Sequence, residues 1–361
     1  MPINIFNTLD DPSASFASTV AIGVNDTDQI VGTYQTASGL HGFLESGGMY
    51  TILEDPLATV GTQAFGINDM GQIVGTYENA SANHGFLLSG GTYTTLDDPS
   101  AITGTTQAFG INDMGQIVGT YQNASGTHGF LFSGGIYTTF FDVPGAPEGT
   151  TQARGINAAG QIVGYYYDNT GKAHGFLYSG GLYTTLDDPL ATGDTTAFGI
   201  NDAGQVVGTY FNAGNHGFLY SGGIYTTLDD FSATSNTTAF GINDAGQVVG
   251  SYRNASGTHG FLETTVPNPP PPPGTTADMI LRNGAGQYEI YDIGSNAILA
   301  GYELGRSGPS GCLAWHRWYR ASAPSMAAIR PTCCCATAIL AGSRSTTSAT
   351  TTSRARGSWA R

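Results

Sequence analysis

The sequence predicts an all-β fold, a six-bladed β-propeller with four-stranded blades. The first observation is a repeat of about 44 residues, marked by Gly-Ile-Asn-Asp-x-Gly-Gln-x-Val-Gly. The Asn of this marker recurs six times, at Asn25, Asn68, Asn112, Asn157, Asn201 and Asn243. The second observation is that each unit holds four short β-forming runs and shows no helical periodicity. A four-stranded unit of this length has the size of a propeller blade; β-solenoid coils are usually shorter.

Residues 105–144 illustrate one unit. Its four strands are expected at residues 106–112, 116–121, 128–132 and 136–140. In the first turn a Gly follows two residues after Asp113, which suits a tight turn because Gly accepts positive φ. Ile117-Val118 and Phe130-Leu131 place bulky side chains on both faces of the sheet. This pattern is expected of a blade that packs between two neighbours.

The strand count predicts how the ring closes. The first three strands of the unit occur six times, but the fourth follows only five of the third strands. Its missing copy matches the N-terminus, at Ile5–Pro12. We therefore expect the N-terminal strand to complete the last blade, which protects edges that an open stack would expose.

Composition divides the chain into four parts. The propeller is expected at 1–266, a polyproline linker at 267–274, a partial β-repeat module at 275–305 and a disordered tail at 306–361. The tail holds eight Arg, all four Cys and no acidic residue. If the reading frame is moved back by one base, each new codon takes the last base of the preceding codon. The codons of Cys334 and Cys335 then both encode Leu. The shifted frame can then give Asp-Met-Leu-Leu-Arg-Asn, a second copy of Asp278–Asn283, so we interpret the tail as frameshifted.

Charge and composition disfavour several classes of partner and of site. Residues 1–266 contain 23 acidic and three basic side chains, which disfavours nucleic acids and anionic membranes. The same span has no Cys, hence neither disulfides nor a thiolate nucleophile. No stretch is long and apolar enough for membrane insertion. We expect a monomer that is extracellular or on the cell surface, although no N-terminal signal peptide is visible.

The marker followed by His-Gly-Phe-Leu resembles the bacterial HAF extracellular repeats, named for a His-Ala-Phe step. Here the step is His-Gly-Phe in all six copies. The resemblance covers residues 1–266 and implies a secreted or surface-associated repeat protein. It implies no catalytic residues. After the linker, 275–305 is similar to a fragment of another β-repeat found in large bacterial surface proteins.

Several polar residues recur in every unit. A histidine opens each third strand, at His41, His84, His128, His174, His216 and His259. Imidazole is the commonest metal ligand, but equivalent positions lie a whole blade apart. We therefore expect each histidine to bond a local turn. Acidic pairs end most fourth strands, as in Asp97-Asp98, and are interpreted as solvated strand ends. Asp69, Asp113, Asp202 and Asp244 are interpreted as turn formers. No cofactor is expected, and bound calcium remains an option.

The fourth unit departs from the pattern. It carries Arg154 where the other units have Ile22, Phe65, Phe109, Phe198 or Phe240, and Ala158-Ala159 replaces Asp-x in its turn. Tyr165 and Tyr167 follow, with Lys172 nearby. An arginine with aromatic residues suits a carboxylate or a sugar, so Arg154, Tyr165, Tyr167 and Lys172 form the candidate ligand site. Drift of one repeat explains the same facts.

The sequence favours a non-catalytic extracellular binding or display module whose partner is a glycan or a protein. No Ser-His-Asp set, metal-spaced cluster or phosphate loop stands out from the repeats. One alternative is a propeller enzyme, a hydrolase or lyase with its site in the central channel. Another is a structural spacer stabilised by calcium.

Overall fold

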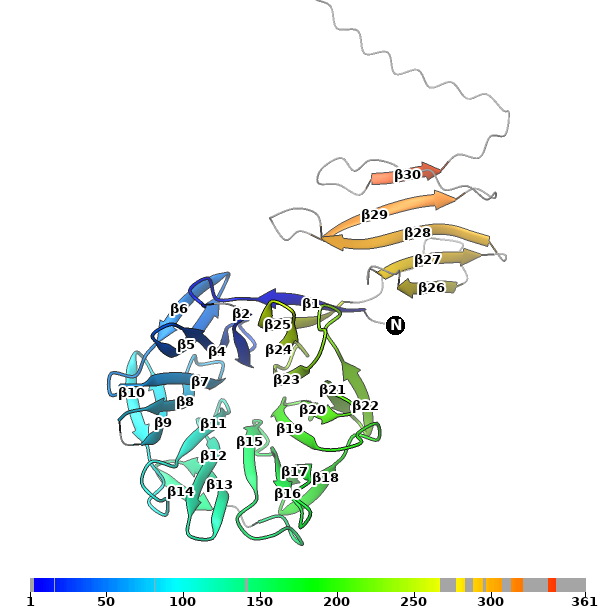
Figure 1. Ribbon diagram of the computed structural model, residues 1–361. Helices are drawn as coiled ribbons and strands as arrows, with labels where there is room; N and C mark the ends of the chain where they lie inside the picture. The colour runs from blue at the N-terminus through cyan, green and yellow to red at the C-terminus, as the bar shows by residue number, and fades with distance from the viewer. Residues whose placement is uncertain are drawn as a thin grey trace, which may run out of the picture. The chain divides into compact units, whose positions relative to one another are not determined.

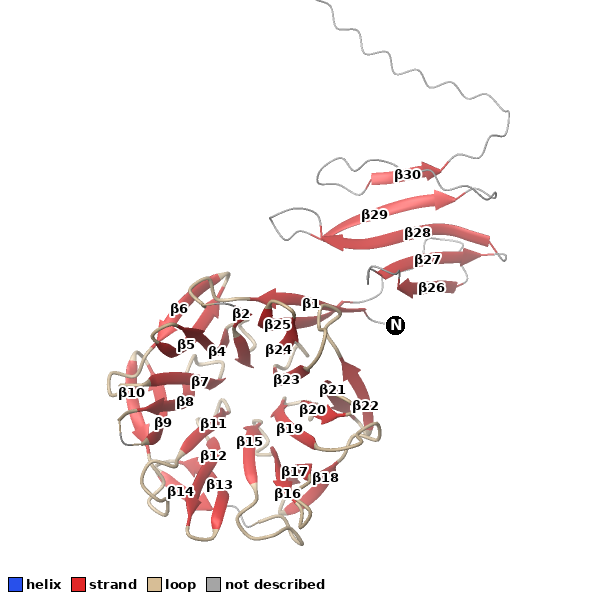
Figure 2. Cartoon of the chain, viewed as in Figure 1, coloured by secondary structure: helices blue, strands red, loops and turns tan. Residues whose placement is uncertain are grey.

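The computed structural model describes residues 3–15, 17–80, 82–139 and 142–266 of the chain, together with five strands further on. The chain divides into two compact units, Met1–Pro267 and Asn268–Arg361. Throughout the described residues the regular structure is β-strand, without a helix (Figure 2). No helix of these residues could therefore span a membrane. The predicted all-β class is confirmed.

In the first unit, antiparallel sheets are arranged around a central opening (Figure 1). Three sheets have four strands each, joined in chain order. Their strands are β11 Gln107–Ile111, β12 Ile117–Asn123, β13 Gly126–Ser133 and β14 Ile136–Thr139; β15 Gln152–Ile156, β16 Ile162–Tyr167, β17 Ala173–Ser179 and β18 Leu182–Leu186; β19 Thr195–Ile200, β20 Val206–Phe211, β21 Asn215–Ser221 and β22 Ile224–Leu228. The four-stranded repeat predicted from the sequence is confirmed in these sheets.

Two further repeats form one eight-stranded sheet. Its strands are β3 Val20–Val24, β4 Ile30–Thr36, β5 Gly39–Ser46, β6 Met49–Leu53, β7 Gly61–Ile67, β8 Ile73–Glu78, β9 Asn83–Ser89 and β10 Thr92–Leu96. The two groups of four are joined by a single parallel pair, Leu40 with Gly61. This bridge lies between the third strand of one repeat and the first strand of the next.

The last repeat takes its outer strand from the other end of the unit. Its own strands are β23 Thr237–Ile242, β24 Val248–Asn254 and β25 Gly257–Val266. β25 pairs antiparallel with β1 Ile3–Leu9, from Ile3–Val266 to Leu9–Gly260. It also pairs in parallel with the short β2 Ala17–Ser18. Phe6 of β1 is buried, and its ring meets the ring of Phe261 edge-on at 5.2 Å.

The core consists of similar clusters between successive repeats. In one cluster Val74 of β8 packs with Ile117, Tyr121 and Phe130 of the following repeat. Both faces of β12 are buried as a result. The marker glycine in this strand is required by close packing, because a Cβ on Gly119 would lie 2.0 Å from the backbone oxygen of Gln107. Apolar burial of this kind is the main stabilising contribution to the fold.

The second unit contains one five-stranded sheet, in the order β26 Ala277–Arg282, β27 Tyr288–Gly294, β28 Ala297–Arg306, β29 Leu313–Arg320 and β30 Thr337–Ala341. The first three strands fall almost entirely within the predicted β-repeat module. The last two differ from the expectation of a disordered tail over 306–361. β29 is rich in Trp and Tyr, which favour strands. The linker 267–274 and the rest of the tail lie outside the described residues, and the frameshift remains a prediction.

Candidate functional site at the two ends of the central channel

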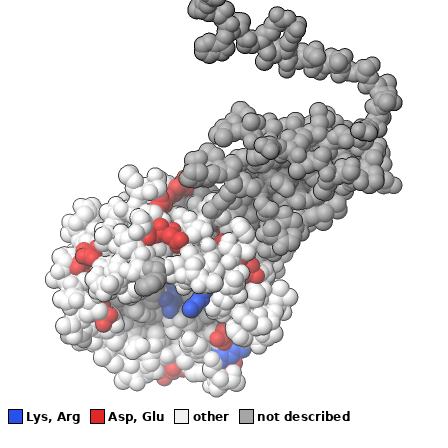
Figure 3. Space-filling model, turned by 45° about the horizontal axis from the view of Figure 1, so that its top comes forward, with Lys and Arg blue, Asp and Glu red and all other residues white. Residues whose placement is uncertain are grey.

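The first strand of every repeat contributes one side chain to a central cavity. These side chains occupy the position three residues before the marker Asn: Ile22, Phe65, Phe109, Arg154, Phe198 and Phe240. With Gln107 they enclose about 340 Å³. An apolar cavity of roughly 150 Å³ already holds benzene, so this one has room for a small organic ligand. Figure 3 shows a hollow at the centre of one face, with Lys and Arg atoms inside it.

The cavity wall is largely aromatic. The rings of Phe65 and Phe109 lie 5.1 Å apart between centres, and those of Phe198 and Phe240 lie 5.2 Å apart. Cζ of Arg154 lies 3.9 Å from the centre of the Phe109 ring. The ring face therefore stabilises the guanidinium by a cation–π interaction, typically worth about 0.5–2 kcal/mol.

Arg154 is held from behind by two polar groups. Its Nη2 donates to Oε1 of Gln152 at 2.8 Å and to the hydroxyl of Tyr165 at 2.9 Å. That hydroxyl in turn donates to Oε1 of Gln152 at 2.8 Å. Nε of Arg154 is buried without a hydrogen-bond partner. Among the described residues, no carboxylate forms an ion pair with Arg154. A guanidinium has five N–H donors, so three of them have no partner in this part of the chain.

The substitution of Tyr165 complements that of Arg154. At the position of Tyr165 the other repeats carry a small hydroxyl residue: Thr33, Thr76, Thr120, Thr209 or Ser251. A threonine side chain lacks the ring that carries the tyrosine hydroxyl, so its own hydroxyl lies much closer to the backbone. Compared with the other repeats, the fourth thus carries a cation, Arg154, in place of an apolar side chain. On the adjacent strand it also carries Tyr165, the acceptor that orients this cation. The two changes act together in the structure.

The structure brings only part of the predicted site together. Arg154 lines the cavity, and Tyr165 lies behind it, 9% exposed. The Tyr167 ring meets that of Tyr165 edge-on at 5.7 Å. Burial, and after it the interaction with Tyr165, raises the pKa of Tyr167. Lys172 lies elsewhere, in a turn where its backbone N–H donates to Oδ1 of Asp168 at 2.9 Å. Neither Tyr167 nor Lys172 lines the cavity.

The phenylalanines of the cavity were missed as site residues. The sequence shows an aromatic residue at this position in four of six repeats, and this regularity was the available signal. In a strand, alternate side chains point to opposite sides, so periodicity alone does not reveal which set faces the channel. At this position the sequence therefore singles out Arg154 by its charge, but not the phenylalanines.

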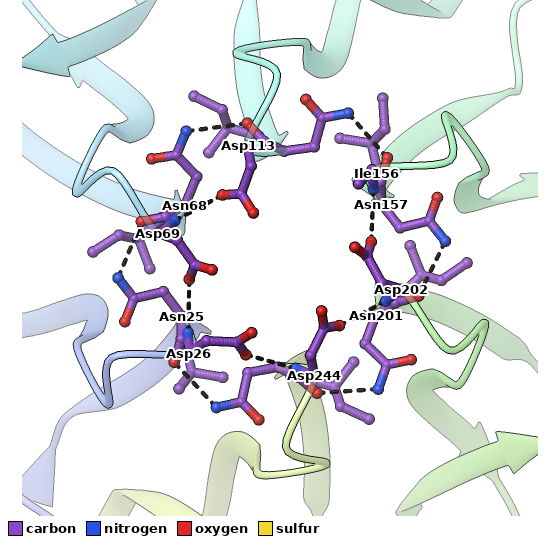
Figure 4. Close-up of a pocket in the computed structure, with 18 residues that line it drawn as sticks. Asn25, Asp26, Asn68, Asp69, Asp113, Ile156, Asn157, Asn201, Asp202 and Asp244 are labelled. Carbon is purple, nitrogen blue, oxygen red and sulfur yellow. Dashed lines mark hydrogen bonds between the residues drawn. The ribbon is translucent and has the colours of Figure 1, made fainter.

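At the opposite end of these strands the marker asparagines form a ring of hydrogen bonds (Figure 4). Each Nδ2 donates to the backbone oxygen of the next marker Asn, and the last, Asn243, donates to Asn25 at 3.1 Å. Each Oδ1 accepts from a backbone N–H four residues on, as in Asn157 from Gln161 at 3.0 Å. The asparagines are therefore buried with both ends of their amides bonded.

Five carboxylates follow the asparagines around this end of the channel: Asp26, Asp69, Asp113, Asp202 and Asp244. Each accepts a backbone N–H of the preceding repeat, as Asp69 does from Asp26 at 2.8 Å. These aspartates lie in the first turn of their repeats, as predicted, and their side chains link neighbouring repeats. Burial, together with the charges of Asp202, Asp26 and Asp69, raises the pKa of Asp244. The fourth repeat again differs, since Ala158 leaves the ring without a sixth carboxylate.

This acidic end encloses only about 80 Å³. In the part of the chain that the structure describes, no group of three or more His, Cys, Asp or Glu side chains has an arrangement that could hold a metal ion. Like charges repel more strongly where water is scarce. The acidic ring thus disfavours anions at this end of the channel, and Arg154 favours them in the cavity.

The recurring histidines link the third strand to the end of the fourth. Each Nδ1 faces an acidic side chain, in the pairs His41–Glu54, His84–Asp97, His128–Asp142, His174–Asp187, His216–Asp229 and His259–Asp10. In His128 and His259, Nε2 contacts a serine of the preceding turn at 2.9 Å. Nε2 of His41, His174 and His216 likewise contacts the preceding turn, so the predicted bond to a local turn is confirmed in five of the six repeats. Burial lowers the pKa of His216, but the hydrogen bond to Asp229 and the charge of that carboxylate raise it. The net result is a raised pKa.

The interpretation of the acidic pairs as solvated strand ends was wrong for their second members. Asp11, Asp55, Asp98, Asp188 and Asp230 are each only 3–4% exposed. Asp55 shows why: its Oδ1 accepts the N–H of Leu57 at 2.8 Å, and its own N–H donates to the hydroxyl of Thr62 at 3.0 Å. These carboxylates therefore fix the loop that leads to the next repeat.

The chain matches no protein-family model and no curated protein. Several solved structures are similar to it. A lectin mutant from Aleuria aurantia in complex with Fucα1-6GlcNAc has a TM-score of 0.48 at 13% identity, covering 72% of this chain and 99% of the lectin. A gluconolactonase from Xanthomonas campestris has a TM-score of 0.46 at 13% identity, covering 72% and 89%. TolB from Acinetobacter baumannii has a TM-score of 0.44 at 11% identity, covering 69% and 54%.

Proposed function

We propose that residues 1–266 form a closed six-bladed β-propeller that acts as a non-catalytic binding module and takes one ligand in its central cavity, at Arg154. Closure is supported by the pairing of β1 with β25 and by the hydrogen bond from Asn243 to Asn25. The HAF-like repeat supports a place outside the cell or on its surface, with a glycan or another surface component as the source of the ligand.

The observation that carries this proposal is the unpaired cation in the aromatic cavity. The fold does not require it, because four other repeats have phenylalanine and one has isoleucine at the same position. Moving a charge out of water without an ionic partner costs free energy. In a unit so rich in carboxylates, an arginine that forms no ion pair within the described residues is most simply explained by a ligand that completes the site.

The cavity lining favours binding over catalysis. Its side chains are apolar apart from Gln107 and Arg154. General acid–base catalysis needs a His, a carboxyl or a comparable group within hydrogen-bond reach of the substrate, and covalent catalysis needs an activated nucleophile. The seven lining residues supply neither. The histidines and the acidic side chains described above are engaged with one another or with backbone groups away from this cavity.

The experiment is a thermal-shift screen of the full chain and of Arg154→Phe, with neutral sugars, acidic sugars, carboxylates and amines, followed by a glycan array. A ligand that binds only the folded state raises the melting temperature. We expect at least one compound class to stabilise the wild type and not the variant, which should fold because it restores the residue of four repeats. No stabilisation of the wild type, or equal stabilisation of both proteins, would contradict the proposal.

A further inference from the structure

We infer that the ligand of the central cavity is a small monocarboxylate with an apolar body, whose carboxylate pairs with Arg154 and whose body lies among the phenylalanines. This inference rests on the proposed function and specifies its ligand. It follows from three properties of the cavity: the charge of Arg154, the composition of the wall and the asymmetry of the ring.

The charge selects an anion. The guanidinium keeps its positive charge at physiological pH, and Gln152 and Tyr165 occupy only Nη2. Nη1 thus retains both of its donors, and a carboxylate oxygen can accept from it in a charge-assisted hydrogen bond. Gln152 and the Tyr165 hydroxyl are neutral, so they orient the guanidinium without cancelling its charge. The site is thereby set to bind a carboxylate more strongly than a neutral amide of the same shape.

The wall selects an apolar body. Of the seven side chains that line the cavity, five are hydrocarbon, and only Arg154 and Gln107 are polar. A sugar would bring several hydroxyls into this space, and each buried hydroxyl without a partner weakens binding. An aryl or alkyl body instead gains free energy as its surface is removed from water. The volume of about 340 Å³ suits one aromatic ring with a short chain.

The asymmetry selects a single carboxylate. Arg154 occupies one of six equivalent positions, so a second carboxylate on the same ligand would lie among the rings. Further along the channel it would meet the acidic ring formed by residues such as Asp113 and Asp202. Both placements are unfavourable. The ligand should therefore bind at one copy per ring, with its charged end at the fourth repeat.

The test is isothermal titration of the full chain with 3-phenylpropionate, 3-phenylpropionamide and glucuronate. We expect 3-phenylpropionate to bind at one copy per chain. The amide should bind at least about tenfold more weakly, because a hydrogen bond to a charged group contributes about 1.5–3 kcal/mol. Arg154→Phe should lose the preference for the acid over the amide. Lys172→Ala also removes one positive charge, but away from the cavity, and should bind as the wild type does.

The outcomes separate the two proposals. Equal binding of acid and amide would overturn the anionic ligand, and tighter binding of glucuronate would overturn the apolar body; both would leave a binding cavity at Arg154. If none of the three probes binds, while a neutral compound from the screen depends on Arg154, the ligand class is wrong and the proposed function stands. If no compound of either experiment depends on Arg154, both proposals fail. A melting curve of each variant verifies that it is folded.

Discussion

The side-chain amide of Asn243 donates a hydrogen bond to the backbone oxygen of Asn25, 218 residues earlier in the chain. The same kind of hydrogen bond joins each of the five remaining pairs of successive marker asparagines. One polar residue, repeated at a fixed period, thus sets both the turn of its own repeat and the contact with the next. Stability and site geometry in this unit can therefore be tested with substitutions that the other repeats already carry.

The buried asparagines should be important for stability. We expect Asn157→Ala to lower the free energy of unfolding by roughly 2–3 kcal/mol, because it leaves the carbonyl of Asn201 and the N–H of Gln161 without their partner. Asp113→Ala is the matched control, since the fourth repeat has Ala158 at that position, and it should change stability by less than about 1 kcal/mol. Urea denaturation, followed by far-ultraviolet circular dichroism, gives the free energy of unfolding of both variants. Similar losses in the two variants would contradict this role.

The N-terminal strand should hold the last repeat. Phe6→Ala removes a buried ring from the side of Phe261, and we expect it to cost roughly 3–5 kcal/mol. Deletion of residues 1–12 should lower the melting temperature further. The exposed Asn7 of the same strand provides the control, because Asn7→Ala should stay within about 0.5 kcal/mol of the wild type. An unchanged melting temperature after the deletion would rule out closure by β1.

Stability should fall as the pH rises through the titration of Glu263. This side chain is 2% exposed, and within the described residues its one side-chain hydrogen bond comes from Thr265. Burial raises its pKa from 4.5 to about 7. The native state thus keeps a proton that the unfolded state releases, so stability is lost between about pH 4.5 and 7 and stays lower above it. The loss is on the order of 3 kcal/mol.

Glu263→Gln should remove this loss. Denaturation at pH 5 and pH 8 should show a smaller difference for the variant than for the wild type. The exposed Glu148→Gln is the control and should keep the wild-type profile. If wild type and Glu263→Gln respond to pH in the same way, Glu263 is not the group responsible.

Arg154 and Tyr165 should be energetically coupled. Tyr165→Thr restores the residue of the other repeats but removes an acceptor from Nη2 of Arg154, so alone it should destabilise the protein. In the double variant with Arg154→Phe part of that cost should be recovered. We expect a coupling free energy of about 0.5–3 kcal/mol from the double-mutant cycle. Strict additivity of the two changes would indicate independent drift.

Calcium should not stabilise the protein. The carboxylates of the acidic ring already accept backbone N–H groups, as Asp244 does from Asp202 at 2.7 Å, and calcium needs six to eight oxygen ligands. We expect the same melting temperature in calcium and in EDTA, with magnesium as the control for ionic strength. A rise in calcium alone would favour a calcium-stabilised spacer.

The sequence predicted the strands of the repeat because turn glycines and apolar runs are local signals. It also predicted the outer strand at Ile5–Pro12, since a missing copy can be counted. The burial of Asp55 and its equivalents was not predictable in this way, because it depends on the loop that folds over the strand end. The cavity was likewise hidden: Arg154 stood out by its charge, but the phenylalanines around it acquire their role only when the first strands meet around the channel.

The most direct test of the central claim is to observe Arg154 itself by nuclear magnetic resonance during ligand addition. The Nε–H signal of Arg154 is identified by its absence from the spectrum of Arg154→Phe. If the ligand pairs with this guanidinium, saturating 3-phenylpropionate should shift that signal and leave the signal of Arg253 unchanged. A titration in which the Arg154 signal stays in place, while the protein remains folded, would contradict a ligand at this site.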